Sequence, residues 1–563
     1  GTTLDIRITI SLDGGDEDIG IDNLSVTGTF SGLVFENGSW SPNAPDANTG
    51  NDNALLFDEG NTFTVSSDAD VSNLRLFEGS ALSIEADITL TVNDALVNNG
   101  SIEIVSTGSL LQTSATDENS GTGTYTVERN KVHVDYRRFT YWSSPINNET
   151  VGDAFPNSDI LDYHAYDVTA QAFTADNVIT AATVMEAGRG YAVTPDQTTT
   201  GSTLVSVNET TVFDGTAVNN GPVNYAPGQV NGDRYILTGN PYPSAIDADL
   251  FLQGNSALNG TLWFWDHSGP INDPTYASWT TAGGVASHLV APDDYIQVGQ
   301  GFMVQATNTG TPTIAFTNSM RLAGNNSQFF KSETRERFWL NLRKDSTSSQ
   351  NLLIALMDNA TDQYDNGMDG EILKASQSAS FYSLLPDARE LSIQALPKMN
   401  AGESKIIPLG LDAWVTGQYT LALDSLNNWP AQHRIYLLDS AQGKSVDLQQ
   451  QSYTFAVNQS GALHGRFYLM FGANTVGLEE SSRSGEFAYY QRDDYLEMND
   501  ALSQWQPRAV ALYSLNGNLL RHSAWPQGAE SHRLSSADLA QGVYLLQVKA
   551  QNGRVHNQKI YLR

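Results

Sequence analysis

Short runs of alternating hydrophobic and polar residues cover most of the chain, and turn-forming Gly, Asn and Asp residues separate them. Alternation with a period of two places every second side chain on one face of a β-strand. With 563 residues, the chain is long enough for several domains. The pattern predicts an all-β multidomain chain: a short β-solenoid, then β-sandwich or jelly-roll modules, and a C-terminal Ig-like domain.

Residues 1–29 predict one hairpin, with the strands LDIRITISL and IGIDNLSV. Two strands do not form a stable domain, so we expect the terminal hairpin of a truncated upstream β-sandwich. The phrase DEDIGIDNLSV resembles the closing strand of jelly-roll modules in Bacteroidota surface proteins. Clustered carboxylates supply the hard oxygen ligands that calcium prefers, which makes Asp13, Asp16 and Asp22 candidate ligands. A solvated acidic turn is the alternative.

Residues 30–128 contain very short apolar pairs joined by Gly, Asn and Asp corners. Three corners share one pattern, because a Gly-Ser pair precedes the next strand at Gly79-Ser80, Gly100-Ser101 and Gly108-Ser109. Short strands with a recurring corner favour a small parallel β-solenoid. The spacing also fits a plain β-sandwich.

Residues 129–325 contain an internal repeat. Each copy begins with a turn containing small residues and proline (YWSSP, GNPYPS) and ends with a Gly-x-Gly-aromatic-x-Val strand (GRGYAV, GQGFMV). This predicts a β-sandwich of two related halves. A phosphate cradle would need a helix after the glycines, and none is predicted, so we expect these glycines to serve backbone packing.

Alternating segments over residues 326–475 predict a further β-sandwich, and the polar residues 476–485 predict a linker. One loop of this sandwich is rich in oxygen ligands, and its Asp362, Asp365 and Asp369 are candidate calcium ligands. The order is not that of an EF-hand, and such residues also form ordinary turns.

The segment LWFWDHS suggests a carbohydrate platform, on which Trp263 and Trp265 would stack against sugar rings. The alternative is that residues 262–265 alternate across a strand, with one pair in the core.

The composition excludes several classes of protein. The 63 acidic residues against 30 basic ones give a net charge of −33, which disfavours nucleic-acid binding. The chain has no cysteine, which excludes disulfides, zinc–thiolate sites and thiol catalysis. No HExxH or GxSxG motif occurs, and no run is long enough to span a membrane. The chain opens at Gly1 without an export signal, so we expect a processed or trimmed part of a longer polypeptide.

The last part of the chain carries the most specific pattern. Residues 486–563 contain apolar alternation closed by Asn516-Gly517, Gln541-Gly542 and Asn552-Gly553. The ordered phrases VALYSLNG, LAQGVYLLQV and KIYLR resemble the type A C-terminal sorting domain of Bacteroidota type IX secretion cargo. An Ig-like module without an export role is the alternative. YWSSPI and GNPYPSAID resemble segments that commonly precede such domains in large surface proteins.

The resemblance implies recognition by the type IX outer-membrane translocon and its attachment machinery. It also implies passage through the periplasm to a secreted or surface-attached state. The residues it assigns to the recognition surface are Gly517, Gly542, Val543, Tyr544, Lys559 and Leu562.

The sequence leaves more than one function open. The first hypothesis is a non-catalytic, adhesin-like or stalk-like cell-surface protein, whose partners would include surface glycans or other surface proteins. The second is the accessory C-terminal region of a secreted hydrolase with its catalytic domain upstream. A third is a calcium-dependent carbohydrate-binding protein; calcium is the only cofactor that the sequence suggests.

Overall fold

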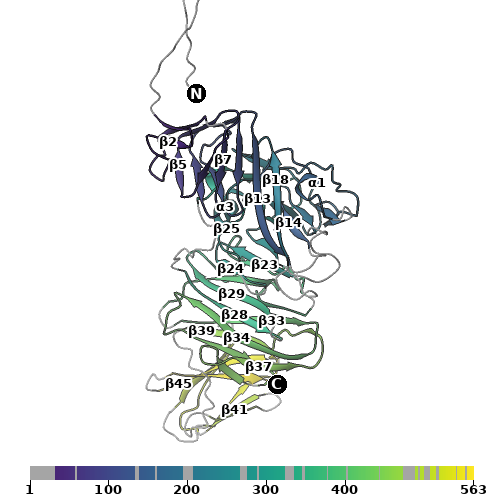
Figure 1. Cartoon of the computed structure of the whole chain (residues 1–563). Helices are drawn as coiled ribbons and strands as arrows, with labels where there is room; N and C mark the ends of the chain where they lie inside the picture. The colour runs from purple at the N-terminus through teal and green to yellow at the C-terminus, as the bar shows by residue number, and fades with distance from the viewer. Residues whose placement is uncertain are drawn as a thin grey trace, which may run out of the picture.

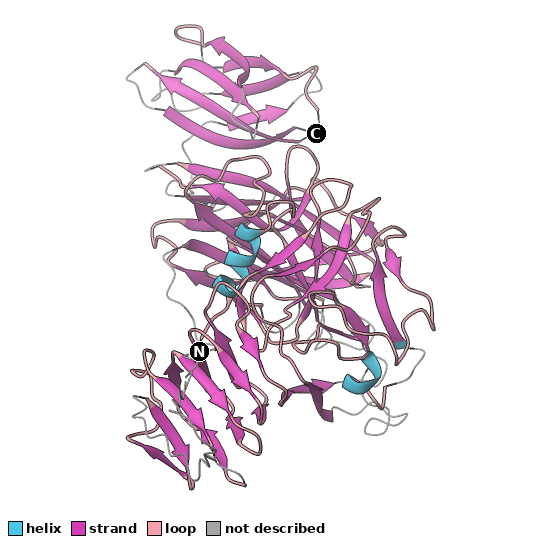
Figure 2. Cartoon of the chain, turned by 90° about the horizontal axis from the view of Figure 1, so that it is seen from above, coloured by secondary structure: helices cyan, strands magenta, loops and turns pink. Residues whose placement is uncertain are grey.

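A computed structural model shows an elongated molecule that is almost entirely β (Figure 1), which confirms the predicted fold class. Figure 2 shows the short helices as isolated turns among the strands. The structure describes residues 32–57, 60–133, 139–158, 162–194, 207–266, 275–287, 291–323, 335–344, 349–376, 378–400, 403–442, 444–472, 488–491, 495–499, 507–514, 519–529, 531–540, 542–551 and 555–562.

The first module is a parallel β-solenoid, as predicted. Its three sheets stack successive coils with parallel register, such as Leu33–Ala54 and Ala54–Leu74. The first sheet contains β1 (Leu33–Glu36), β3 (Asn53–Leu56), β6 (Asn73–Leu76), β9 (Leu96–Asn98) and β12 (Asn119–Ser120), with β2 (Ser39–Ser41) antiparallel to β1. The second contains β4 (Thr62–Val65), β7 (Ala81–Ile84), β10 (Ser101–Ile104) and β13 (Thr124–His133), and the third β5 (Ala69–Val71), β8 (Thr89–Val92) and β11 (Ser109–Gln112).

The recurring Gly-Ser corner has a steric cause. A Cβ atom on Gly100 would lie 2.1 Å from the carbonyl oxygen of Ser80, the corresponding corner of the coil below. Only glycine lets the two corners stack this closely. Inside the coils, side chains such as Leu76, Ile84 and Ile104 are fully buried in one column of core residues.

The second module has two halves whose strands follow the same order. The first sheet is β14-β17-β15-β16, and the second is β20-β26-β22-β23 with β24 at its edge. The first half contains β14 (Thr140–Trp142), α1 (Val151–Ala154), β15 (Tyr163–Asp167), β16 (Ala172–Phe173) and β17 (Tyr191–Val193). The second contains β20 (Tyr235–Gly239), β21 (Ile246–Asp247), α3 (Ala248–Gly254), β22 (Leu262–Asp266), β23 (Thr275–Thr280), β24 (Gly283–Val285), β25 (Tyr295–Ile296) and β26 (Gly301–Gln305). Strands β18 (Val207–Gly215), β19 (Val223–Tyr225) and β27 (Ile314–Phe316) and the 3₁₀-helix η2 (Asn318–Met320) complete the module.

The two halves contact each other reciprocally through their repeated motifs. The backbone N–H of Ser143 donates to Gly299 O (2.8 Å), and the N–H of the corresponding Gly239 donates to Gly188 O (3.2 Å). A Cβ atom on Gly301 would lie 2.8 Å from the backbone of Tyr141. The Gly-x-Gly pairs therefore let the backbones of the two halves approach closely, the packing role predicted for them.

The third module is one hydrogen-bonded sheet of twelve strands around its own core. Most neighbours are antiparallel, while β29 and β32 are parallel. The strands are β28 (Glu336–Arg343), β29 (Ser349–Met357), β30 (Gly370–Glu371), β31 (Ala379–Leu384), β32 (Glu390–Pro397), β33 (Ser404–Ala413), β34 (Gly417–Asn427), β35 (Arg434–Asp439), β36 (Lys444–Asp447), β37 (Tyr453–Val457), β38 (Gly461–Ala462) and β39 (Phe467–Gly472).

The C-terminal strands form two small sheets that face each other. One contains β40 (Ala488–Gln491), β41 (Tyr495–Asn499) and β44 (Ser531–Ser535), and the other β42 (Pro507–Tyr513), β43 (Leu519–Ala524), β45 (Gly542–Ala550) and β46 (Val555–Leu562). Leu496 and Leu534 from the first sheet share a buried core with Leu512 and Leu546 from the second. We call residues 32–472 the body and residues 488–562 the tail.

Some predictions fall outside this description. Two sets of predictions lie outside the described residues. One is the predicted hairpin of residues 1–29, with Asp13, Asp16 and Asp22, and the other is Gly517 in the tail. The domain boundaries stay predictions. Two hydrophobic core clusters extend across them: one runs from Leu33 to Val298, and another joins Ala282 to Ile393. Within the described parts of the chain, no helix is long and apolar enough to cross a membrane.

Candidate functional site

The first candidate site is the tail, where the structure separates the predicted recognition residues into two groups. Gly542 begins β45, and Val543 follows it with a partly exposed side chain. Tyr544 and Leu562, in contrast, are buried in the tail core. The Tyr544 hydroxyl donates to Ala540 O at 2.6 Å. Tyr544 and Leu562 are therefore part of the tail core, and their predicted role in recognition stays a prediction.

Lys559 lies in the last strand, β46, where it pairs with Leu545 of β45. The same ladder pairs Gly542 with Leu562. The predicted recognition residues of the described tail thus share one edge strand and its neighbour, at the end of the four-stranded sheet.

The second candidate is the Asp-rich loop before β30, and its carboxylates are used for folding. Asp369 accepts the backbone N–H groups of Asp365 and Ala395, both at 2.7 Å. Asp362 forms an ion pair with Lys405 at 2.7 Å. Among the residues that the structure describes, no three His, Cys, Asp or Glu side chains come together as a metal site. The calcium interpretation of Asp362, Asp365 and Asp369 thus gains no support.

The third candidate was the pair Trp263 and Trp265. Trp263 is 1% exposed, and its indole N–H donates to Glu371 O at 3.0 Å. A buried ring has no face for a sugar, so the stacking interpretation does not fit Trp263. Trp265 is partly exposed, with its ring centroid 6.0 Å from that of Tyr141 and 4.9 Å from that of Tyr276.

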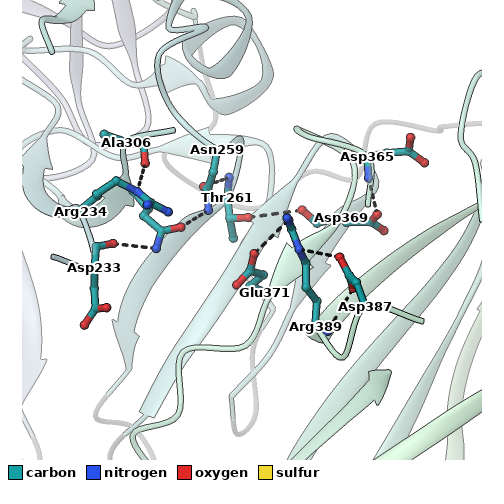
Figure 3. A network of polar contacts seen from close by, with 11 residues as sticks. Asp233, Arg234, Asn259, Thr261, Ala306, Asp365, Asp369, Glu371, Asp387 and Arg389 are labelled. Atoms are coloured by element: carbon teal, nitrogen blue, oxygen red, sulfur yellow. Dashed lines mark hydrogen bonds and ion pairs between the residues drawn. The ribbon is translucent and has the colours of Figure 1, made fainter. Parts of the chain in front are cut away.

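The Asp-rich loop and the β22 strand meet at the junction between the second and third modules (Figure 3). The hydroxyl of Thr261 donates to Asp369 O at 3.4 Å. Just before Asp369 in the loop, Met368 O accepts a hydrogen bond from the Thr280 hydroxyl at 2.8 Å, and Gly367 O accepts one from the Thr281 hydroxyl at 2.6 Å. Two segments suggested as separate ligand sites are therefore partners in one structural junction.

A second junction joins the solenoid to the two-half module through a buried cation, Arg321. Its guanidinium donates to Leu110 O at 2.6 Å and to Ser244 Oγ at 2.7 Å. It also donates to Asn220 Oδ1 at 3.0 Å and Asn318 Oδ1 at 3.2 Å. Burial lowers the pKa of Arg321 to about 9, and these acceptors offset part of that cost.

A cavity of about 250 Å³ lies where β13, β14, β22 and β26 meet, and sequence analysis missed it. Arg129 and Lys131 line one side, and Tyr141, Trp142 and Trp265 line another. Burial lowers the pKa of Arg129 to about 10. Burial also holds the pKa of Lys131 well below its usual value, although the negative charges of Glu209 and Asp266 raise it in part. The available signal was the alternation Tyr125, Val127, Arg129, Lys131, in which cations occupy the inward positions.

Comparisons with known proteins identify the family of the body and the role of the tail. The family model described as "Domain of unknown function (DUF8693)" matches residues 26–471, and the model described as "Secretion system C-terminal sorting domain" matches residues 494–563. No curated protein matches the chain. A solved chain titled "Biofilm associated protein - BSP domain" aligns with 76% of this chain and 97% of its own, at 8% identity and a TM-score of 0.12, too low to carry an argument. The chain therefore belongs to the Domain of unknown function (DUF8693) family, and its sorting domain marks it as a type IX secretion cargo protein.

Proposed function

We propose that this exported protein is a non-catalytic, adhesin-like or stalk-like component of the cell surface. The sorting domain indicates export to a secreted or surface-attached state and implies contact with the type IX machinery. The finer role rests on the body, because the tail matches the sorting domain and the body makes up most of the chain.

The observation that carries the proposal is that three modules of the body form one continuous block. One hydrophobic cluster runs from Leu33 in the solenoid to Val298 in the second module. Another joins Ala282 and Val285 of the second module to Leu353 and Ile393 of the third. Modules with shared cores do not rotate freely against one another, so the body is suited to hold a surface at a fixed distance from the cell.

Directed contacts reinforce both junctions. Arg321 ties the solenoid to the second module, and the Trp339 indole donates to Gly284 O at 2.8 Å across the next junction. Asn351 adds a bond to Ala286 O at 3.1 Å. A protein that acts as a spacer or adhesin needs this continuity, whereas an enzyme needs a set of reacting groups, and the sequence contains no HExxH or GxSxG motif.

The test compares cells that carry the full chain with cells whose chain lacks residues 26–471 but keeps the tail. We expect both chains to reach the surface and only the full chain to promote attachment to glycan-coated or cell-coated surfaces. Equal attachment of both cell types would contradict the adhesive role. Turnover of a polysaccharide or protein substrate by the purified full chain would contradict the non-catalytic part.

A further inference from the structure

The inward face of β13 changes from apolar to cationic along its length. Tyr125 and Val127 are buried in the solenoid core, and the next two residues on the same face are Arg129 and Lys131. A strand keeps its alternation, so the change is one of chemistry and not of direction. The solenoid core ends at Val127, and the cavity begins at Arg129.

Arg129 is a partly exposed residue whose guanidinium lacks a full set of acceptors. Its Nη1 atom is buried and has no hydrogen-bond partner, and the same is true of Gln297 Oε1 and Thr140 Oγ1 on the wall of the cavity. Buried polar atoms in native proteins are nearly always paired, because an unpaired one loses its hydrogen bonds to water without replacement. Arg321 shows the ordinary solution in this same chain, with four acceptors around one guanidinium.

Among the residues that the structure describes, carboxylates act on one of the two cations that line the cavity, Lys131, and not on the other, Arg129. Lys131 pairs across the strands with Glu209, and the fields of Glu209 and Asp266 both act on it. Burial lowers the pKa of Arg129, and no carboxylate of the described part of the chain is among the causes of that shift. A ligand with a single carboxylate matches this charge better than a doubly charged phosphate does.

The unpaired atoms also specify the rest of the ligand. Arg129 requires an acceptor, Gln297 Oε1 requires a donor, and the Thr140 hydroxyl accepts or donates. A carboxylate beside hydroxyl groups satisfies all three, whereas acetate or a hydrocarbon acid does not. The partly exposed Trp265 adds a flat apolar wall, the kind of surface on which a ring lies.

We propose that this cavity binds one carboxylated sugar ring of an acidic polysaccharide, with the carboxylate on Arg129, the ring against Trp265 and hydroxyl groups on Gln297 and Thr140. The cavity lies at the meeting point of the solenoid and the two halves, a common position for ligand sites. The inference deepens the adhesive part of the proposed function and supplies its ligand class.

The test is calorimetric titration of the purified full chain with glucuronate. A ligand of this size is expected to bind with a Kd of about 1 mM. Glucose, acetate and glucose 6-phosphate are the comparison ligands, and each should bind at least tenfold more weakly. Tighter binding of acetate or of the phosphate than of glucuronate would overturn the ligand class, and the absence of glucuronate binding would overturn the site.

Two variants locate the site. Arg129→Gln should weaken glucuronate binding at least tenfold, and Trp265→Ala should weaken it several-fold. The matched control is Arg75→Gln, because Arg75 is an exposed arginine on solenoid strand β6 and lies outside the cavity lining; it should leave binding unchanged. Equal binding by Arg129→Gln and the wild-type chain would contradict the proposal.

Arg129→Met provides a readout that does not depend on a ligand. Replacing a buried, unpaired charge by an apolar side chain removes a desolvation cost, so the Tm should rise, whereas a purely structural arginine would lower it. Because these measurements use purified protein, they are separate from cell attachment. Glucuronate binding without attachment would count against the proposed function alone.

Discussion

The body and the tail differ in the contacts that hold their β-sheets together. In the body, cores and hydrogen bonds cross from one module to the next, as at Arg321 and at the Thr261–Asp369 contact. The tail core consists of tail residues alone. The body carries most of the acidic excess of the chain, while residues 486–563 are close to neutral. The comparison teaches that the tail, which contains the sorting domain, and the body are separate structural units.

The largest expected loss of stability comes from a substitution at the junction between the second and third modules. Gly260 has φ +81°, and a Cβ atom there would lie 2.2 Å from Gly367 Cα in the Asp-rich loop. Gly260→Ala should lower the free energy of unfolding of the body by about 4 kcal/mol, because backbone strain and a backbone clash combine. Gly228→Ala is the matched control, with φ +97° and open space around it, and should cost about 1 kcal/mol. Denaturant melts followed by tryptophan fluorescence measure both, and equal effects would contradict the tight junction.

The next effect loosens the solenoid from the second module. Arg321→Gln removes most of four hydrogen bonds and leaves buried acceptors at Leu110, Asn220 and Asn318. We expect a loss of about 3 kcal/mol in the body, with the tail unaffected. Hydrogen exchange would show the solenoid strands losing protection. Unchanged protection there would mean that the shared core alone holds the junction.

A smaller effect is confined to the tail. Leu562 is 2% exposed in the last strand, so Leu562→Ala should destabilise the tail by about 2 kcal/mol through the cavity it leaves. Leu519, which is 55% exposed in β43, is the matched control, and its replacement by Ala should stay within about 0.5 kcal/mol. If the body also lost stability in Leu562→Ala, the two units would not be independent.

The last comparison concerns pH dependence, which is expected to have opposite signs in the two units. Burial raises the pKa of Asp369 in the body to about 7, while an unfolded aspartate titrates near about 4. The folded body therefore holds a proton that the unfolded chain releases, and its stability falls as pH rises from about 4 to about 7. In the tail, burial lowers the pKa of His532, so tail stability falls as pH drops below the usual imidazole pKa.

Thermal melts across pH 4–8 measure both slopes. Asp369→Asn should flatten the contribution of this group in the body, and His532→Gln should flatten the slope in the tail. Two slopes of the same sign in the wild-type chain would contradict the assignment.

Much of the fold was predictable because its signals are local. The Gly-Ser corners indicate the solenoid, in which Gly100 stacks closely on Ser80 of the coil below, and the apolar alternation of residues 486–563 indicates the tail strands. The repeated ends of the two halves indicated a duplication. The reciprocal bonds between Ser143 and Gly299 and between Gly239 and Gly188 were not predictable, because they depend on how the halves dock.

The candidate sites were harder to predict, because each depends on which face of a strand points inward. Trp263 and the Asp-rich loop are candidate ligand sites in the sequence, each beside a structural alternative, and in the structure they meet at a junction where the Trp263 indole donates to Glu371 O. Arg129 and Lys131 were not predicted as site residues, because the cavity they line forms only where β13 meets β14, β22 and β26. Both the junction at Trp263 and the cavity at Arg129 depend on contacts between segments that are far apart in the sequence.

The division of labour between the two units is tested most directly by deleting residues 486–563 in a cell with type IX secretion and locating the remaining chain. The account predicts that this chain stays in the periplasm, folded and with the melting temperature of the body unchanged. A deletion variant displayed on the cell surface as efficiently as the full chain would contradict the account.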